Sequence, residues 1–203
     1  MERLVLFFRQ GQTDWNLKKM FQGQSNVPLN ETGRKQAGRL ADYLKTHKLE
    51  AIFTSDLDRA HETAKIVNQH HNVSIIKDER LREANLGELE GLILHEAEAR
   101  FGKESIDKWK SNADDALDFS FPNGETKIQV LTRVKAFLDI LFLKNQNYKS
   151  IAISTHGAVI HKLVFHLMGD SYYEYPVTNC SLFIFKERNG IYQFIEYKDF
   201  SSI

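Results

Sequence analysis

The chain has 203 residues, of which 42% are hydrophobic and 27% are charged, as in an ordinary globular domain. Its 27 lysines and arginines balance its 27 aspartates and glutamates, which excludes a general electrostatic attraction to nucleic acid or to an anionic membrane. The single cysteine, Cys180, excludes an internal disulfide and favours a reducing compartment. Because no apolar run approaches the roughly 20 residues of a membrane-spanning helix, we expect a cytoplasmic protein with no nucleic-acid or membrane partner.

The first part of the chain alternates short apolar runs with longer segments whose apolar residues recur every three to four positions. In the first of these longer segments, Leu40, Tyr43 and Leu44 share one helical face, and Asn30 or Thr32 can cap its start. The pattern predicts strands over 3–8, 49–55 and 73–77, and helices over 30–47 and 56–71.

The middle of the chain, residues 78–125, is less regular, and we predict an insertion or lid region over 84–124 rather than a second domain. Within that region only residues 93–101 have the pattern of a helix. A longer helix is predicted over 125–144, where the apolar stripe consists of Val130, Val134, Phe137, Leu138 and Leu141.

The last part of the chain adds a buried strand over 149–155 and a helix over 157–169 that ends at Gly169. Residues 180–198 are predicted to form a hairpin, because Asn-Gly at 189–190 is a strong type I′ turn signal, and Cys180 is interpreted as a buried strand residue. Strands that alternate with helices indicate an α/β fold, a three-layer α/β/α sandwich with a mainly parallel sheet. The sequence has no repeat or linker, which favours a single domain over 1–203.

Chemistry-bearing residues follow three of the predicted strands. Because the carboxyl ends of parallel strands meet at one edge of a sheet, where ligands bind, we expect these residues to converge. Guanidinium groups suit phosphate oxygens, and glycines let backbone amides approach an anion. A lone arginine is more often a surface ion pair, but this set at three strand ends favours a phosphate site. The residues are Arg9, Gln10 and Gly11 after the first strand, Thr54, Ser55 and Arg59 after the second, and Thr155, His156 and Gly157 after the fourth.

Six motifs follow one another in order from the first strand to the last predicted helix. They are RQGQTDWN, FQGQSNVPLNETGRKQA, IFTSDLDRAHETA, LREANLGELEG, FPNGET and ISTHGAVI. Each is weak alone, but the series resembles the successive motifs of the histidine phosphatase superfamily, whose fold is called phosphoglycerate mutase-like. The resemblance implies phosphoryl chemistry that needs no metal and no organic cofactor.

The resemblance also implies which residues hold the phosphoryl group. Arg9 and Arg59 would clamp it, and Asn16 would hydrogen-bond it as well. Gln22 and Gly23 would lie near the substrate. A phosphate monoester carries nearly two negative charges at neutral pH, which the two guanidinium groups offset.

Charge stabilisation and proton transfer would fall to three further positions. By the same resemblance, His156 and the backbone amide of Gly157 would stabilise charge on the transferring phosphoryl. Glu83 would donate a proton to the leaving oxygen and later serve as the base for water.

Gln10 stands where the family has its nucleophilic histidine. An imidazole nitrogen can attack phosphorus, whereas an amide nitrogen delocalises its lone pair into the carbonyl and is a very poor nucleophile. Three explanations remain open: an introduced substitution that silences an enzyme, a natural phosphatase relative that only binds, or a different nucleophile, for which His156 is the sole candidate.

We therefore expect a phosphomonoesterase that hydrolyses a small phosphorylated metabolite through a phosphohistidine, inactivated in this chain by Gln10. The alternative is a catalytically dead module that binds a phosphorylated ligand or inorganic phosphate, and a phosphoglycerate mutase-type transferase comes third. Mutases of the family tend to be longer, so the modest insertion over 84–124 favours hydrolysis. The apolar strands of the last hairpin leave a homodimer through a sheet edge open.

Overall fold

The computed structural model describes residues 2–111, 113–144 and 147–202. Its strands are β1 (Glu2–Arg9), β2 (Ala51–Thr54), β3 (Ser74–Lys77), β4 (Ser150–Thr155), β5 (Leu182–Arg188) and β6 (Ile191–Lys198). They form one six-stranded sheet in the order β3-β2-β4-β1-β5-β6. The first four strands pair in parallel, and the last two add an antiparallel edge beside β1. The predicted α/β fold with a mainly parallel sheet is confirmed.

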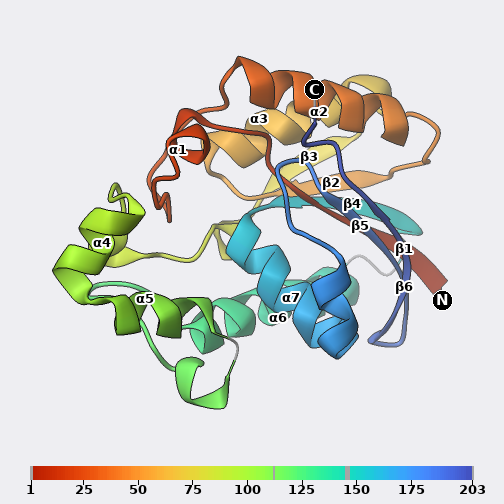
Figure 1. The fold of residues 1–203 in the computed structure, drawn as a ribbon. Coiled ribbons are helices and arrows are strands. Elements are labelled where there is room, and N and C mark those ends of the chain that lie inside the picture. The colour runs from red at the N-terminus through yellow and green to blue at the C-terminus, as the bar shows by residue number, and fades with distance from the viewer. Residues whose placement is uncertain (1, 112, 145–146, 203) are drawn as a thin grey trace.

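Helices cover both faces of this sheet. The helices of the described chain are α1 (Asp14–Leu17), α2 (Glu31–Leu44), α3 (Asp58–Val67), α4 (Leu94–Phe101), α5 (Lys103–Lys110), α6 (Lys127–Lys144) and α7 (Gly157–Met168). Short 3-10 turns add η1 (Asn68–His70), η2 (Glu79–Leu81), η3 (Gly87–Leu89), η4 (Asp114–Ala116) and η5 (Gly169–Glu174). In Figure 1, α2 and α3 lie on one face, α6 and α7 lie on the other, and α4 and α5 extend to one side.

The strands build two hydrophobic cores because successive side chains of a strand point to opposite faces. In β1, Val5 and Phe7 join the core beneath α6 and α7, whereas Leu6 and Phe8 join the core beneath α2 and α3. All four side chains are at most 1% exposed. Burial on both faces explains why β1 is a continuous apolar run rather than an alternating one.

The insertion region contains two helices, and the sequence pattern predicted only α4. Helix α5 was missed because its sequence, KESIDKWK, buries only Ile106 and has no apolar stripe. An aromatic cluster anchors this region to the core beneath α6 and α7. The rings of Phe101, Trp109 and Phe119 contact Phe121, with centroid distances of 5.1, 6.1 and 5.2 Å. This packing fixes Trp109 in place.

Several predicted details are confirmed and one is wrong. Asn30 caps α2 by accepting a hydrogen bond from the Gly33 amide at 2.9 Å. Asn189 and Gly190 both have positive φ, as a type I′ turn requires. Cys180 is buried, but it lies in a left-handed turn (φ 55°) before β5 and not within a strand. The Gln10 carbonyl accepts its amide hydrogen bond, so this turn is tied to the end of β1.

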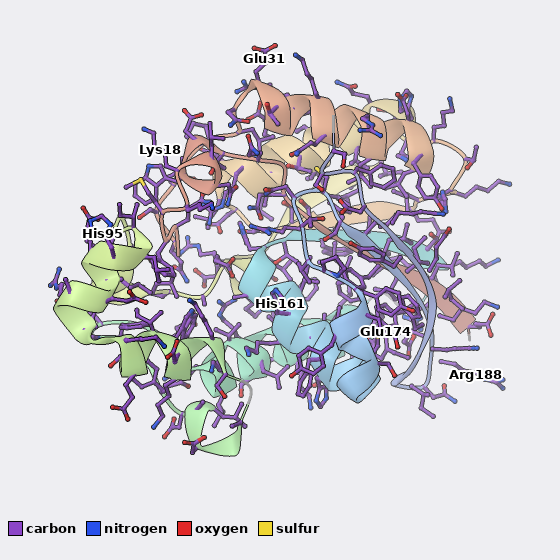
Figure 2. The ribbon with its side chains drawn as sticks, in the orientation of Figure 1. Lys18, Glu31, His95, His161, Glu174 and Arg188 are labelled. Atoms are coloured by element: carbon purple, nitrogen blue, oxygen red, sulfur yellow. The ribbon has the colours of Figure 1, made fainter. Side chains whose placement is uncertain are left out.

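Charged side chains of both signs cover the outside of the molecule. Lys18, Glu31 and Arg188 point away from the fold in Figure 2, whereas His161 lies on α7 near the centre of the same view. Among the described helices, none combines the length and apolar character needed to cross a membrane.

Candidate active site

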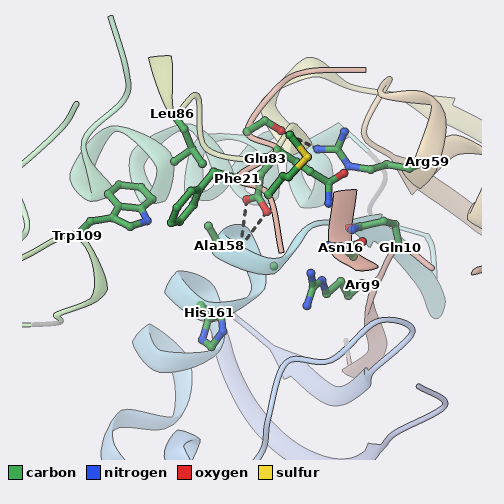
Figure 3. A pocket seen from close by; sticks show the side chains of 14 residues that line it. Arg9, Gln10, Asn16, Phe21, Arg59, Glu83, Leu86, Trp109, Ala158 and His161 are labelled. Carbon is green, nitrogen blue, oxygen red and sulfur yellow. Dashed lines mark hydrogen bonds between the residues drawn. The ribbon is translucent and has the colours of Figure 1, made fainter. Parts of the chain in front are cut away.

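A cavity of about 380 Å³ opens at the carboxyl ends of β1 and β4 (Figure 3). It receives Arg9 from the end of β1, Arg59 from α3 and Gly157 from the start of α7. Most of the predicted site residues line this cavity, and those that do not are Gly11, Thr54, Ser55, Thr155 and His156. The lining residues are Arg9, Gln10, Asn16, Met20, Phe21, Gln22, Gly23, Arg59, Glu83, Leu86, Trp109, Gly157, Ala158 and His161.

Two arginines supply the positive charge of the cavity. The Nη1 atom of Arg9 donates to the Val177 carbonyl at 2.7 Å. The two Nη atoms of Arg59 donate to the carbonyls of Ser25 and Gly23 at 2.7 and 2.6 Å. Both Nε atoms are buried and have no partner in the structure. Burial lowers the pKa of Arg59 to about 10, so the group stays charged at neutral pH.

Two amide side chains are oriented as donors by Thr13, which is fully buried. Asn16 Oδ1 accepts hydrogen bonds from the Thr13 amide at 3.0 Å and from Asn179 Nδ2 at 3.3 Å. Gln22 Oε1 accepts one from the Thr13 hydroxyl at 2.9 Å. With their oxygens engaged, both amides keep their NH₂ groups for a ligand, which suits an anion.

Gln10 and His156 contribute buried polar atoms that lack partners. Gln10 is 2% exposed and its Oε1 has no hydrogen bond. His156 is fully buried behind the cavity, and neither ring nitrogen has a partner. Burial, and then the charges of Arg59 and Arg9, lower the pKa of His156 well below its ordinary value. Unpaired buried polar atoms are costly, so this group is suited to a ligand that pairs with it.

The Glu83 carboxylate contacts the start of α7 and lies across the cavity from the two arginines. Its carboxylate accepts hydrogen bonds from the Ala158 amide at 3.0 and 3.2 Å and from the Ala84 amide at 3.0 Å. A Cβ added to Gly157 would lie 3.4 Å from the Arg9 guanidinium and 3.6 Å from Glu83 Oε2. The glycine therefore separates the carboxylate from the guanidinium, and the positive end of the α7 dipole faces both the carboxylate and the cavity.

The glycine after β1 has a different role from the one we expected. The Gly11 amide donates to the Thr63 hydroxyl at 3.1 Å and does not face the cavity. A Cβ at Gly11 would lie 2.4 Å from the Gly33 carbonyl oxygen, so glycine is needed for the close approach of α2. The expectation that both glycines present amides to an anion is wrong for Gly11.

The family model of the histidine phosphatase superfamily (branch 1) matches residues 5–199. This chain belongs to the histidine phosphatase superfamily.

Relatives of this chain within the family carry both phosphatase and mutase names. The chain is 34% identical over 167 residues to "Uncharacterized phosphatase PhoE" of Bacillus subtilis, which covers 81% of this chain and 77% of that protein. It is 30% identical over 168 residues to 2,3-bisphosphoglycerate-dependent phosphoglycerate mutase 2 of Gloeobacter violaceus, which covers 81% and 75%. The crystal structure of phosphoglycerate mutase from Bacillus anthracis matches with a TM-score of 0.86 and 25% identity over 98% of this chain and 94% of that one. The names span hydrolysis and transfer, so family membership leaves the reaction class open.

The sequence did not reveal several residues that hold the active site of this histidine phosphatase superfamily member in place. Arg133 on α6 donates to the carbonyls of Arg80 and Glu83 at 2.6 and 2.9 Å and pairs with Glu125 at 2.8 Å. Glu125 in turn accepts from the Asn85 amide at 2.8 Å. These bonds fix the loop that carries Glu83. The only sequence signal was an arginine between Val130 and Val134 on an otherwise apolar helix face.

A second carboxylate fixes the loop that receives Arg59. Glu90 accepts from the amides of Gln24 and Ser25 at 2.8 and 2.9 Å. Gly23 has φ of 49°, and a Cβ there would lie 2.0 Å from Glu90 Oε1. Only glycine fits this turn, whose carbonyls hold the Arg59 guanidinium.

Burial raises the pKa of the Cys180 thiol, which disfavours a thiolate nucleophile. The described residues contain no group of three or more His, Cys, Asp or Glu side chains that could hold a metal ion.

Because His156 is buried, we expect the free energy of unfolding to fall in mild acid. The unfolded ring binds a proton near pH 6.5 whereas the folded ring resists protonation, so stability is complete above that pH and falls as the pH drops. We expect His156 to contribute a slope of up to about 1.4 kcal/mol per pH unit below about pH 6.5 in urea unfolding.

Other histidines with lowered pKa values, such as His71, also make the free energy of unfolding fall as the pH drops. The comparison of the parent chain with His156→Gln therefore isolates the contribution of His156. His95→Gln, exposed on α4, serves as the matched control. Identical pH dependence in the parent chain and His156→Gln would contradict the prediction.

Proposed function

We propose that the cavity is the active site of a phosphomonoesterase whose nucleophile position is occupied by Gln10. The observation that carries this proposal is the cluster of buried, unpartnered polar atoms: the Nε atoms of Arg9 and Arg59, Gln10 Oε1 and both ring nitrogens of His156. Arg9, Gln10 and Arg59 line one cavity with Glu83, and His156 directly precedes Gly157 in the wall of the same cavity. A phosphate group supplies the charge and the acceptor oxygens that the donors of such a cluster require.

In the proposed reaction, Arg9 and Arg59 hold the non-bridging oxygens, with the NH₂ groups of Asn16 and Gln22 as further donors. A histidine at position 10 would attack phosphorus, forming a P–N bond as the ester P–O bond breaks. Glu83 would give its proton to the leaving oxygen. The Glu83 carboxylate would then take a proton from water as that water attacks the phosphohistidine, releasing inorganic phosphate.

Gln10 interrupts this sequence at its first step. Its amide nitrogen has no available lone pair, so the proposed P–N bond does not form. The arginines and amides that would bind the phosphoryl group do not depend on the nucleophile. We therefore propose that the chain as it stands binds phosphate monoesters and leaves them intact.

A catalytically dead binding module is the second candidate, and Gln10 itself is the observation that favours it. A mutase-type transfer is the third, since several relatives carry mutase names. The proposed hydrolysis needs neither a metal nor an organic cofactor. Three expectations stay predictions: a single domain over 1–203, a cytoplasmic location and the formation of a homodimer.

Binding of inorganic phosphate to the unmodified chain tests the site directly. We expect calorimetric titration to detect saturable binding, and Asn16→Asp to weaken it by about tenfold or more, because the substitution replaces a donor with a like charge. The new carboxylate keeps the oxygen that Thr13 and Asn179 contact, so the fold is retained.

Asn72→Asp is the matched control, because it adds the same charge at an exposed residue before β3, at the opposite edge of the sheet. It should bind phosphate as the parent chain does. Absence of phosphate binding at millimolar concentration would overturn both the phosphatase and the binding-module proposals.

A further inference from the structure

A second chamber of about 350 Å³ adjoins the active-site cavity. The two share Trp109, Ala158 and His161 as lining residues, so they lie side by side. The chamber lies between the end of α5, the start of α6, α7 and η5. Figure 3 shows Trp109 at the end of the cavity remote from Arg59, with His161 on the helix that begins at Gly157.

The chamber is basic. Its wall includes Lys110, Lys127 and Lys162, and its described lining contains no aspartate or glutamate. Lys127 is 2% exposed and donates to the Lys108 carbonyl at 3.0 Å and to the Ser111 carbonyl. Lys127 therefore holds the end of α5 in position, and all three lysines contribute positive charge to the wall of the chamber.

Helix α7 connects the two chambers. Ala158, whose amide contacts Glu83, is followed by His161 and Lys162 at i+3 and i+4, so the three share one helix face. Burial, and then the nearby charge of Lys127, lower the pKa of Lys162 to about 8. A cation that is partly desolvated beside another cation gains more from an anion than a fully solvated lysine does.

The wall between the charged ends is apolar. Phe21, Leu86 and Trp109 line the cavity beyond Glu83, and Figure 3 shows them gathered on the side remote from the arginines. A ligand that spans the two chambers would therefore present phosphate at one end, an apolar segment in the middle and a second charge at the other end.

We propose that the second chamber is a subsite for a carboxylate carried by the alcohol part of the substrate. This inference rests on the proposed function and narrows it to phosphate monoesters with an apolar linker and a second, distal anionic group. Lys110 and Lys162 are the specificity-determining residues, because both line the second chamber with a cationic side chain.

The test uses the unmodified chain, which is expected to bind monoesters without consuming them. Phenyl phosphate and 4-carboxyphenyl phosphate differ only in the distal carboxylate. We expect calorimetry to give about tenfold tighter binding for the carboxylated ester, the size of one charge-assisted contact. The ratio of the two affinities should fall towards one in Lys162→Met and in the double variant Lys110→Met/Lys162→Met.

Lys48→Met is the control, because Lys48 is exposed before β2, at the opposite edge of the sheet, and should leave the ratio unchanged. Equal affinity for the two esters in the unmodified chain overturns the subsite while the proposed function stands. A preference that persists in the double variant also overturns it. If neither ester binds, the proposed function itself fails, and the subsite fails with it.

Discussion

Gln10→His is expected to convert the chain into a phosphatase. Turnover of 4-nitrophenyl phosphate should rise by roughly 10³- to 10⁶-fold over the parent chain, the range that loss of a nucleophile costs in other hydrolases. The physical reason is local: the position is 2% exposed, next to Arg9, and already holds an unpartnered polar atom. An imidazole at this position supplies a nucleophilic nitrogen, while the surrounding binding groups stay unchanged.

A folded Gln10→His protein that binds phosphate but turns over no ester from a broad panel would favour the binding module. Phosphoryl transfer between two positions of one sugar acid, faster than phosphate release, would favour the mutase. Gln12→His is a useful control, because it introduces the same side chain two residues away and outside the lining of the cavity. It should stay at the activity of the parent chain.

Glu83→Gln, made in the Gln10→His protein, is expected to give the next largest effect. Loss of a general acid costs about 10²- to 10⁴-fold, and the cost depends on the leaving group. An alkyl phosphate, whose alkoxide needs a proton, should lose the most kcat/KM. This quantity reports the step that expels the leaving group and not the later attack of water, in which Glu83 is the proposed base. The 4-nitrophenyl ester, whose phenolate leaves unaided, should lose much less. Glutamine keeps an oxygen for the Ala158 amide, so the start of α7 is retained.

Glu88→Gln provides the comparison within the same loop. Glu88 pairs with Arg100 at the surface and has no contact with the cavity. It should leave both substrates unaffected. Equal losses of kcat/KM for the alkyl and the nitrophenyl esters in Glu83→Gln would contradict proton donation by Glu83 and would indicate a structural role.

The sequence was sufficient for the features that depend on strand ends. Arg9, Arg59 and Gly157 follow buried parallel strands, and parallel topology forces such positions to one edge of the sheet. The apolar stripe of α6 and the turn at Asn189 and Gly190 were equally local signals, and both were confirmed. These predictions required no knowledge of which loops pack together.

The features that were missed depend on contacts between distant segments. Arg133 reaches the carbonyls of the Glu83 loop across 50 residues of sequence. Thr13 orients the Gln22 amide only because the turn at 22–23 folds back onto it. Gly11 was predicted to face the anion because it follows the first strand. Its actual constraint is the close approach of α2, a separate helix, which the local sequence does not reveal. No periodicity or motif in one segment records such a partner.

The most direct test of the account is the location of the phosphoryl group in Gln10→His. The variant is mixed with 4-nitrophenyl phosphate, quenched during turnover and mapped by peptide mass spectrometry under alkaline conditions that preserve phosphohistidine. The account predicts one phosphoryl group, on residue 10, that disappears when substrate is exhausted. A phosphoryl group on His156, or turnover with residue 10 unmodified throughout, would contradict it.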